Sequence, residues 1–107
     1  MELVMGVDGG STKTHLALAD LGGRLRAFVQ GPASNHESIG MQAVRRVFEG
    51  MAGRAFRRAG CGPGDVKAAC FGLSGGDLPE DFVRIRREAV APLGLGGPAE
   101  IANDAFL

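Results

Sequence analysis

The first residues with types suited to chemistry stand near the start of the chain, where an apolar run ends at Asp8. Two glycines, two hydroxyl side chains and a lysine follow, in the order Gly9, Gly10, Ser11, Thr12 and Lys13. Glycines let backbone N–H groups approach a phosphate closely, and hydroxyl and ammonium groups add donors. An aspartate beside them can hold Mg²⁺ through its waters, because Mg²⁺ keeps much of its hydration shell. The segment predicts a nucleotide phosphate site with its metal ion; the simpler alternative is a polar, glycine-rich hairpin.

A second glycine-rich turn follows a later apolar run. Its members are Ser74, Gly75, Gly76 and Asp77. Because ligands of open α/β sheets gather at the carboxyl ends of the strands, these residues are candidates for substrate binding. An ordinary connection from a strand to a helix, with Asp77 as the helix cap, explains the same residues equally well.

Two other polar segments could contact a substrate. Asn35 and His36 lie in a loop and can hydrogen-bond sugar hydroxyls or an amide, although a loop of this composition needs no ligand. Asp104 follows a short apolar run and Asn103, a position where a carboxylate can accept the proton of a hydroxyl that attacks a phosphate. A lone aspartate there is more often a turn residue or a cap. Asp8 and Asp104 would lie at the same edge of a sheet if their strands were parallel neighbours.

Hydrophobic periodicity predicts the elements that hold these residues, because alternation indicates strands and intervals of three and four residues indicate helices. The expected order is strands at 3–7, 14–20 and 24–30, a helix at 38–59, a strand at 66–73, a helix at 79–92 and a strand at 99–102. This order predicts an α/β fold of ribonuclease H-like type, with a mixed sheet in order βββαβαβ and helices packed on it. A Rossmann-type domain is the alternative, but its glycine turn opens a helix, whereas the residues after Gly10 alternate like a strand.

Composition restricts the classes of function. The chain has 107 residues, one domain at most, and its 12 basic and 12 acidic residues cancel. A balanced charge gives no reason to expect nucleic acid or a membrane surface as a partner, and neither a signal peptide nor a membrane span is visible. We therefore expect a cytoplasmic protein. Cys61 and Cys70 lack metal-ligand spacing, and Cys70, within an apolar run, is expected to be a small core residue.

The polar segments occur in an order that resembles one superfamily. The segments Gly6–Thr14, Gly31–His36, Leu73–Asp77 and Asn103–Ala105 together resemble motifs of the acetate and sugar kinase, Hsc70 and actin superfamily. Within it they are most similar to the N-acetylglucosamine kinases and the BadF/BadG/BcrA/BcrD-type ATPases. The resemblance runs through nearly the whole chain and implies ATP and Mg²⁺ as ligands.

The resemblance also implies a role for each candidate residue. Asp8 positions Mg²⁺, the glycines, hydroxyls and lysine that follow it hold ATP phosphates, and Asp104 deprotonates the attacking hydroxyl. Asn35 and His36 approach a hexosamine, and the turn Ser74–Asp77 lines the sugar pocket. The implied activity is phosphoryl transfer from ATP to a sugar hydroxyl, on N-acetylglucosamine or a related amino sugar.

A second domain is a further implication of the resemblance. Family members carry the second phosphate motif and the adenosine site on that domain, and catalysis takes place in the cleft between the two. Residues 1–107 then form the N-terminal ribonuclease H-like domain, without the C-terminal nucleotide-binding domain. We expect the chain alone to bind Mg-ATP weakly and to show no kinase turnover.

Two other functions fit the same motifs. A BadF-type ATPase would couple hydrolysis to the activation of a reductase or dehydratase, through an iron–sulfur cluster held by cysteines at a dimer interface. Neither Cys61 nor Cys70 stands where such a ligand is expected, and Asn35 and His36 favour a sugar. A non-catalytic sugar- or nucleotide-binding module is the third interpretation, and Asp104 argues against it. The identity of the sugar and the oligomeric state stay open, with a homodimer among the options.

Overall fold

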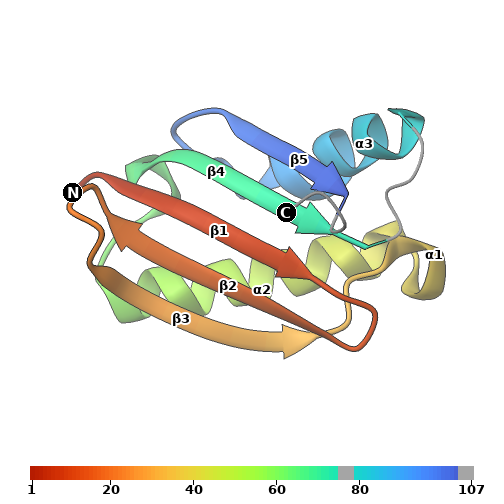
Figure 1. The fold of residues 1–107 in the computed structure, drawn as a ribbon, viewed down its shortest axis with the longest axis horizontal. Helices are drawn as coiled ribbons and strands as arrows, with labels where there is room; N and C mark the ends of the chain where they lie inside the picture. Colours follow the sequence, from red (N-terminus) through yellow and green to blue (C-terminus); the bar gives the residue numbers. More distant parts are fainter. Residues whose placement is uncertain (75–78, 104–107) are drawn as a thin grey trace.

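The computed structural model describes residues 1–74 and 79–103, which form a five-stranded mixed sheet with helices packed against one face (Figure 1). The strands are β1 (Leu3–Gly9), β2 (Lys13–Asp20), β3 (Leu25–Pro32), β4 (Val66–Leu73) and β5 (Ala99–Asn103). The helices are α1 (His36–Ile39), α2 (Met41–Ala59) and α3 (Pro79–Ile85), with the short helical turns η1 (Pro63–Asp65), η2 (Arg86–Val90) and η3 (Ala91–Leu93). The expected α/β class, with a mixed sheet and helices packed on it, is confirmed.

The sheet order β3-β2-β1-β4-β5 brings the ends of distant strands together. β1 pairs antiparallel with β2 and parallel with β4, and β4 pairs parallel with β5. Gly9 at the end of β1 is level with Leu73, which is level with Asn103 at the end of β5. The three parallel strands therefore end at one edge of the sheet, although β4 lies between β1 and β5.

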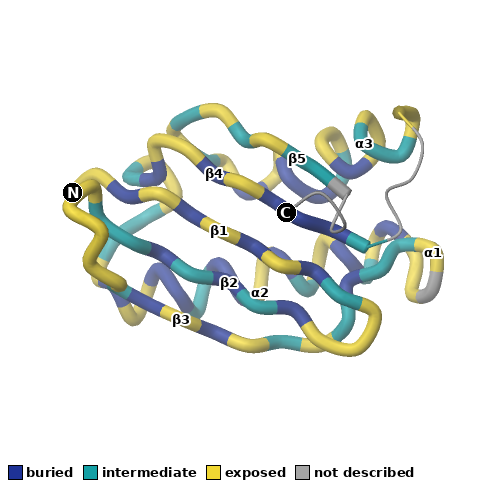
Figure 2. The backbone as a smooth tube through the Cα atoms, in the orientation of Figure 1, coloured by how far each residue is buried: buried dark blue, intermediate teal, exposed yellow. Residues whose placement is uncertain are grey.

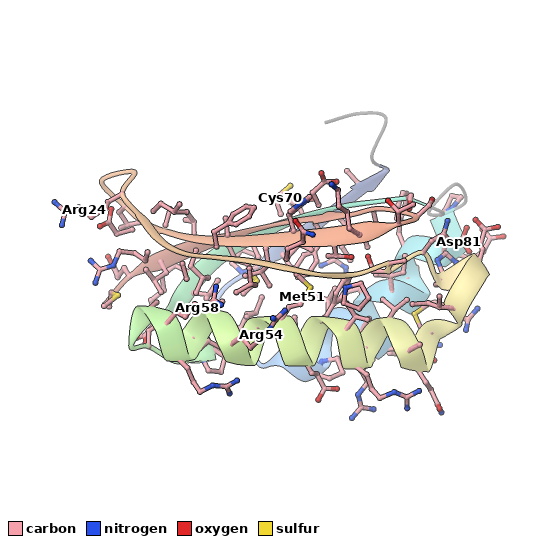
Figure 3. All side chains as sticks on the ribbon, turned by 90° about the horizontal axis from the view of Figure 1, so that it is seen from below. Arg24, Met51, Arg54, Arg58, Cys70 and Asp81 are labelled. Carbon is pink, nitrogen blue, oxygen red and sulfur yellow. The ribbon has the colours of Figure 1, made fainter. Side chains whose placement is uncertain are left out.

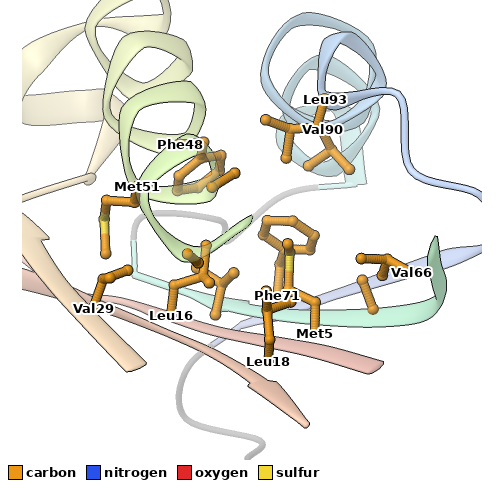
Figure 4. Close-up of a cluster of buried hydrophobic side chains, with 14 of the residues drawn as sticks. Met5, Leu16, Leu18, Val29, Phe48, Met51, Val66, Phe71, Val90 and Leu93 are labelled. Carbon is orange, nitrogen blue, oxygen red and sulfur yellow. The ribbon is translucent and has the colours of Figure 1, made fainter. Parts of the chain in front are cut away.

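The apolar core lies between the sheet and the helices (Figure 4). β1 alternates strictly, with Leu3, Met5 and Val7 buried and the residues between them exposed. Phe48 of α2 and Phe71 of β4 are both almost fully buried, and their ring centroids are 5.4 Å apart. We call the face of the sheet that packs against the helices the covered face. Because burial of such side chains is the main favourable term in folding, the packing of this face holds the strand ends in place.

The opposite face of the sheet, which we call the open face, is covered by none of the described elements (Figures 2 and 3). A shallow hollow on it is lined by small residues of three strands, among them Gly6, Ala17 and Cys70. Cys70 is exposed, so its predicted place in the core is wrong. The reason is geometric, because successive side chains of a strand point to opposite faces and Phe71 takes the covered one.

The two predicted helices differ in form from the observed ones. Gly40 has φ 86°, a conformation that residues with a side chain rarely adopt, and it separates α1 from α2 within the helix expected at 38–59. The helix expected at 79–92 continues after α3 as the π-helical turn η2 and the 3₁₀ turn η3. Pro92 fits the first turn of η3, where a backbone N–H would have no partner within the helix. Within the described ranges, no helix combines the length and apolarity needed to cross a membrane.

Candidate functional site

β1 and β2 are joined by the glycine turn, Gly9–Lys13, which is the segment predicted to bind phosphate. The Gly10 N–H donates to the carbonyl oxygen of Lys13 at 2.9 Å, which closes the turn tightly. The two hydroxyl residues and the lysine of the turn are exposed, so a ligand can reach them. A Cβ atom added at Gly9 would lie 2.5 Å from Ser34 Oγ, which is closer than real contacts allow. A larger residue at Gly9 would have to displace the side chains of Ser34 and Leu73, which favours glycine at the end of β1.

Two backbone hydrogen bonds connect the glycine turn to the other predicted segments. The Ser34 N–H donates to the Gly10 carbonyl oxygen at 3.1 Å, and the Ser74 N–H donates to the Gly9 carbonyl oxygen at 2.9 Å. The loop that leads to Asn35 and the residue Ser74 therefore meet at the end of β1. Segments that are far apart in the sequence are neighbours at this edge of the sheet.

A buried pair of hydroxyl groups fixes the loop that leads into α1. Thr14 is 0% exposed and Ser34 is 3% exposed. Thr14 Oγ1 lies 2.8 Å from the carbonyl oxygen of Pro32 and 2.7 Å from Ser34 Oγ. Since a hydroxyl has a single proton, Thr14 donates to the carbonyl and accepts from Ser34. The sequence analysis did not identify this pair. The available signal was the alternation along β2, which places the side chain of Thr14 on the same buried face as Leu16 and Leu18.

Asn35 and His36 stand at the start of α1, and both side chains have partners within the chain. Asn35 Oδ1 accepts a hydrogen bond from the Glu37 N–H at 3.0 Å and so caps the helix. The amide N–H groups of Asn35 have no hydrogen-bond acceptor among the described residues, so they are available as donors. His36 Nε2 lies 3.4 Å from Asp81 Oδ1 of α3, and the His36 side chain is 8% exposed.

Ser74 follows the last residue of β4, and its hydroxyl oxygen is buried without a hydrogen-bond partner among the described residues. A buried hydroxyl without a partner costs stability, so a ligand group at this position would relieve that cost. The other predicted residues of this turn, Gly75, Gly76 and Asp77, lie outside the described residues, as does Asp104.

Asp8 is exposed on the open face, level with His15 of β2. Residues 1–74 and 79–103 contain no group of three His, Cys, Asp or Glu side chains that could hold a metal ion. Mg²⁺ is commonly bound through one or two carboxylates together with phosphates and waters. The single carboxylate of Asp8 lies next to a turn with exposed hydrogen-bond donors. This arrangement fits a Mg²⁺ ion that arrives together with a nucleotide.

The class of the fold is shown by comparison with solved structures. A protein from Chromobacterium violaceum assigned as an N-acetylglucosamine kinase matches with a TM-score of 0.68 and 23% identity. The match covers 99% of this chain and 36% of that protein. At this level of identity the likeness establishes a shared fold and nothing about the ligand. No family model matches the chain.

Curated relatives point to a more particular group of proteins. The chain is 30% identical over 105 residues to the N-acetylmuramic acid/N-acetylglucosamine kinase of Clostridium acetobutylicum, covering 98% of this chain and 34% of that enzyme. It is 27% identical over 113 residues to the N-acetyl-D-glucosamine kinase of Dictyostelium discoideum, covering 99% of this chain and 35% of that enzyme. The chain thus spans about a third of the length of these relatives. The expected similarity to N-acetylglucosamine kinases is supported, whereas the BadF-type relationship has no specific support.

Proposed function

We propose that the chain is the N-terminal, ribonuclease H-like part of an ATP-dependent sugar kinase. The observation that carries the proposal is the meeting of the glycine turn, the loop before Asn35 and the turn at Ser74 through the carbonyl groups of Gly9 and Gly10. A kinase must hold a phosphate and a hydroxyl acceptor side by side, because phosphoryl transfer depends mainly on positioning and charge stabilisation. The names of the curated relatives favour N-acetylglucosamine or a related amino sugar as the acceptor.

The glycine turn would bind the phosphates of ATP. Its exposed residues Ser11, Thr12 and Lys13 supply hydroxyl donors and one positive charge, beside the backbone N–H groups of the turn. Asp8 would hold Mg²⁺ through bound waters, on the face of the sheet where its carboxylate is exposed. Bound Mg²⁺ supplies neutralisation of the negative charge on the transferred phosphate.

The sugar would lie between α1 and the turn that follows β4. Asn35 Oδ1 is occupied by the helix cap, so its amide is suited to donate to a sugar oxygen. Ser74 Oγ, which has no partner among the described residues, can both donate and accept. Gly75, Gly76 and Asp77 would complete this pocket. Asp104 would take the proton of the sugar hydroxyl as the bond from its oxygen to the γ-phosphorus forms and the bond to the ADP oxygen breaks.

The adenosine site would belong to a second domain of a longer parent protein, since the chain spans about a third of its curated relatives. The chain alone is therefore proposed to bind Mg-ATP weakly and to lack turnover. A cytoplasmic location and a homodimeric assembly stay predictions from the sequence.

The kinase function is tested by ADP release from the full-length protein with Mg-ATP and a panel of sugars. We expect turnover that depends on an amino sugar, and a decrease in kcat of about 10²- to 10⁴-fold in Asp104→Asn, which loses the proton acceptor. Glu100→Gln, an exposed carboxylate on β5, is the matched control and should retain wild-type kcat. ATP hydrolysis that is independent of sugar would support the activator ATPase instead, and nucleotide or sugar binding without turnover would support a binding module.

A further inference from the structure

Among the described residues, a side-chain contact links the segment that follows Asn35 to the helix that follows Ser74. His36 directly follows Asn35, and Asp81 belongs to α3, the first described helix after Ser74 in the sequence. His36 Nε2 lies 3.4 Å from Asp81 Oδ1. Figure 3 shows Asp81 at the end of the molecule near α1, and Figure 1 shows α1 and α3 at this same end.

Burial leaves His36 little surface with which to contact a ligand. Its side chain is 8% exposed and that of Asp81 is 21% exposed. A polar ring at this depth is stable only with a polar partner, and the Asp81 carboxylate provides one. The geometry therefore favours a role for His36 that acts through Asp81.

α1 needs such external support because it is too short to hold itself. It has four residues, and isolated helices of this length are not stable in water. Its start is capped by the Asn35 side chain, and its end is set by Gly40, whose N–H donates to the His36 carbonyl oxygen at 2.9 Å. These local bonds shape the helix but do not orient it relative to the rest of the site.

Orientation comes from the residues on either side of Asn35. On one side, the Ser34 N–H is bonded to the Gly10 carbonyl oxygen and so to the glycine turn. On the other side, His36 contacts Asp81 and so α3. Asn35 thus lies between a residue that is hydrogen-bonded to the proposed phosphate site and a residue that contacts α3.

We propose that His36 and Asp81 form a strut, the His36–Asp81 pair, that positions Asn35 against the turn at Ser74 for sugar binding. His36 is then a positioning residue and does not itself contact the sugar, in contrast to the role that the family resemblance implies for it. The proposal rests on the proposed kinase function for its consequence, but the strut itself is a property of α1 and α3.

The consequence is tested by kinetics of the full-length protein with His36→Ala, Asp81→Ala and the double variant. Each single variant should raise the KM for the amino sugar by about tenfold, because Asn35 loses its fixed position. The KM for Mg-ATP and kcat should stay within about twofold of wild type, since the tie from Ser34 to the glycine turn is intact. The double variant should be no worse than Asp81→Ala alone, because the loss of Asp81 already breaks its contact with His36.

Matched variants separate the strut from a general loss of charge or structure. Glu37→Ala and Glu80→Ala remove exposed carboxylates next to His36 and Asp81 in the chain, and both should leave the sugar KM unchanged. His36→Gln retains a side-chain N–H that can donate to Asp81, and it should recover part of the lost affinity.

Amide hydrogen exchange of the full-length protein tests the strut without any need for turnover. In the absence of sugar and ATP, the amides of residues 34–40 should exchange about tenfold faster in His36→Ala and in Asp81→Ala, to a similar extent. The amides of β1 should be unchanged. Faster exchange across β1 would report general unfolding, and His36→Gln and Asp81→Asn, which keep polar groups of similar size, would then take the place of the alanine variants.

Three results would overturn the strut. The first is unchanged exchange at residues 34–40 in Asp81→Ala, and the second is additive effects in the double variant. The third is an increase in sugar KM in His36→Ala that Asp81→Ala does not share, because His36 would then contact the sugar directly. A wild-type protein without sugar-dependent turnover, but with the expected exchange changes, would refute the kinase function and support the strut.

Discussion

The covered face of the sheet presents large apolar side chains to the helices, whereas the hollow of the open face is lined mainly by small residues. β1 shows the contrast within seven residues, because Leu3, Met5 and Val7 are at most 4% exposed while Val4 and Gly6 are exposed. The two faces share the same strands, so only the direction of each side chain distinguishes them. An apolar strand is therefore evidence for one buried face, and the second face has to be judged from the size of its residues.

The largest difference between the two faces is expected in the free energy of unfolding when an aromatic ring is removed from each. Phe71→Ala on the covered face should destabilise the chain by about 3–5 kcal/mol, because it leaves a cavity against Phe48. Phe28→Ala on the open face, where the ring is 49% exposed and stacks on His15, should cost less than about 1 kcal/mol. Urea unfolding of the two variants measures the difference. Equal losses would show that the open face is as tightly packed as the covered one.

A smaller difference in the free energy of unfolding is expected when a glycine on each face is replaced by alanine. At Gly31 a Cβ atom would lie 2.5 Å from Met51 Sδ, so Gly31→Ala should destabilise by about 1–3 kcal/mol as Met51 is displaced. At Gly6 a Cβ atom meets nothing within 4 Å, and Gly6→Ala should be neutral or stabilise by up to about 1 kcal/mol. The midpoint of urea unfolding decides the sign for each variant. A loss in Gly6→Ala that matches Gly31→Ala would contradict the described contacts of the open face.

Hydrophobic periodicity was sufficient to predict the positions of the strands. The strand at 66–73 has the predicted bounds, and the other strands differ from prediction by no more than two residues at either end. The position of the glycine turn could be predicted because its glycines favour a tight turn between strands, whereas its binding of phosphate stays a prediction. The helix predicted at 38–59 includes Gly40, because the apolar spacing continues through it and a single glycine does not by itself end a helix.

Contacts between distant segments could not be predicted in the same way. The bonds of Ser34 and Ser74 to the glycine turn, and the contact of His36 with Asp81, depend on how the strands and helices are placed in space. Cys70 shows the same limit, because Ala69, Cys70 and Phe71 are all apolar and periodicity alone does not say which of them faces the helices. The roles of all candidate site residues stay predictions, and Gly75, Gly76, Asp77 and Asp104 also lie outside the described ranges.

The smallest expected effect compares the reactivity of a cysteine on the open face with that of one packed against the core, and it leaves stability unchanged. Cys70 is exposed on the open face, whereas Cys61 is partly buried against the core, and burial followed by the negative charge of Asp65 raises the pKa of the Cys61 thiol. The thiolate is the form that reacts, so iodoacetamide should modify Cys70 about tenfold faster than Cys61 near neutral pH.

Peptide mass spectrometry of the 107-residue chain over a time course measures both rates, and Cys61→Ser and Cys70→Ser assign them. Raising the pH toward the raised pKa of Cys61 increases its thiolate fraction, so the Cys61 rate should still be climbing at alkaline pH. In urea the protection of Cys61 should vanish, because its burial is lost on unfolding. Slow modification of Cys70 in the folded chain would mean that the open face is not accessible to solvent. That result would contradict the described difference between the two faces.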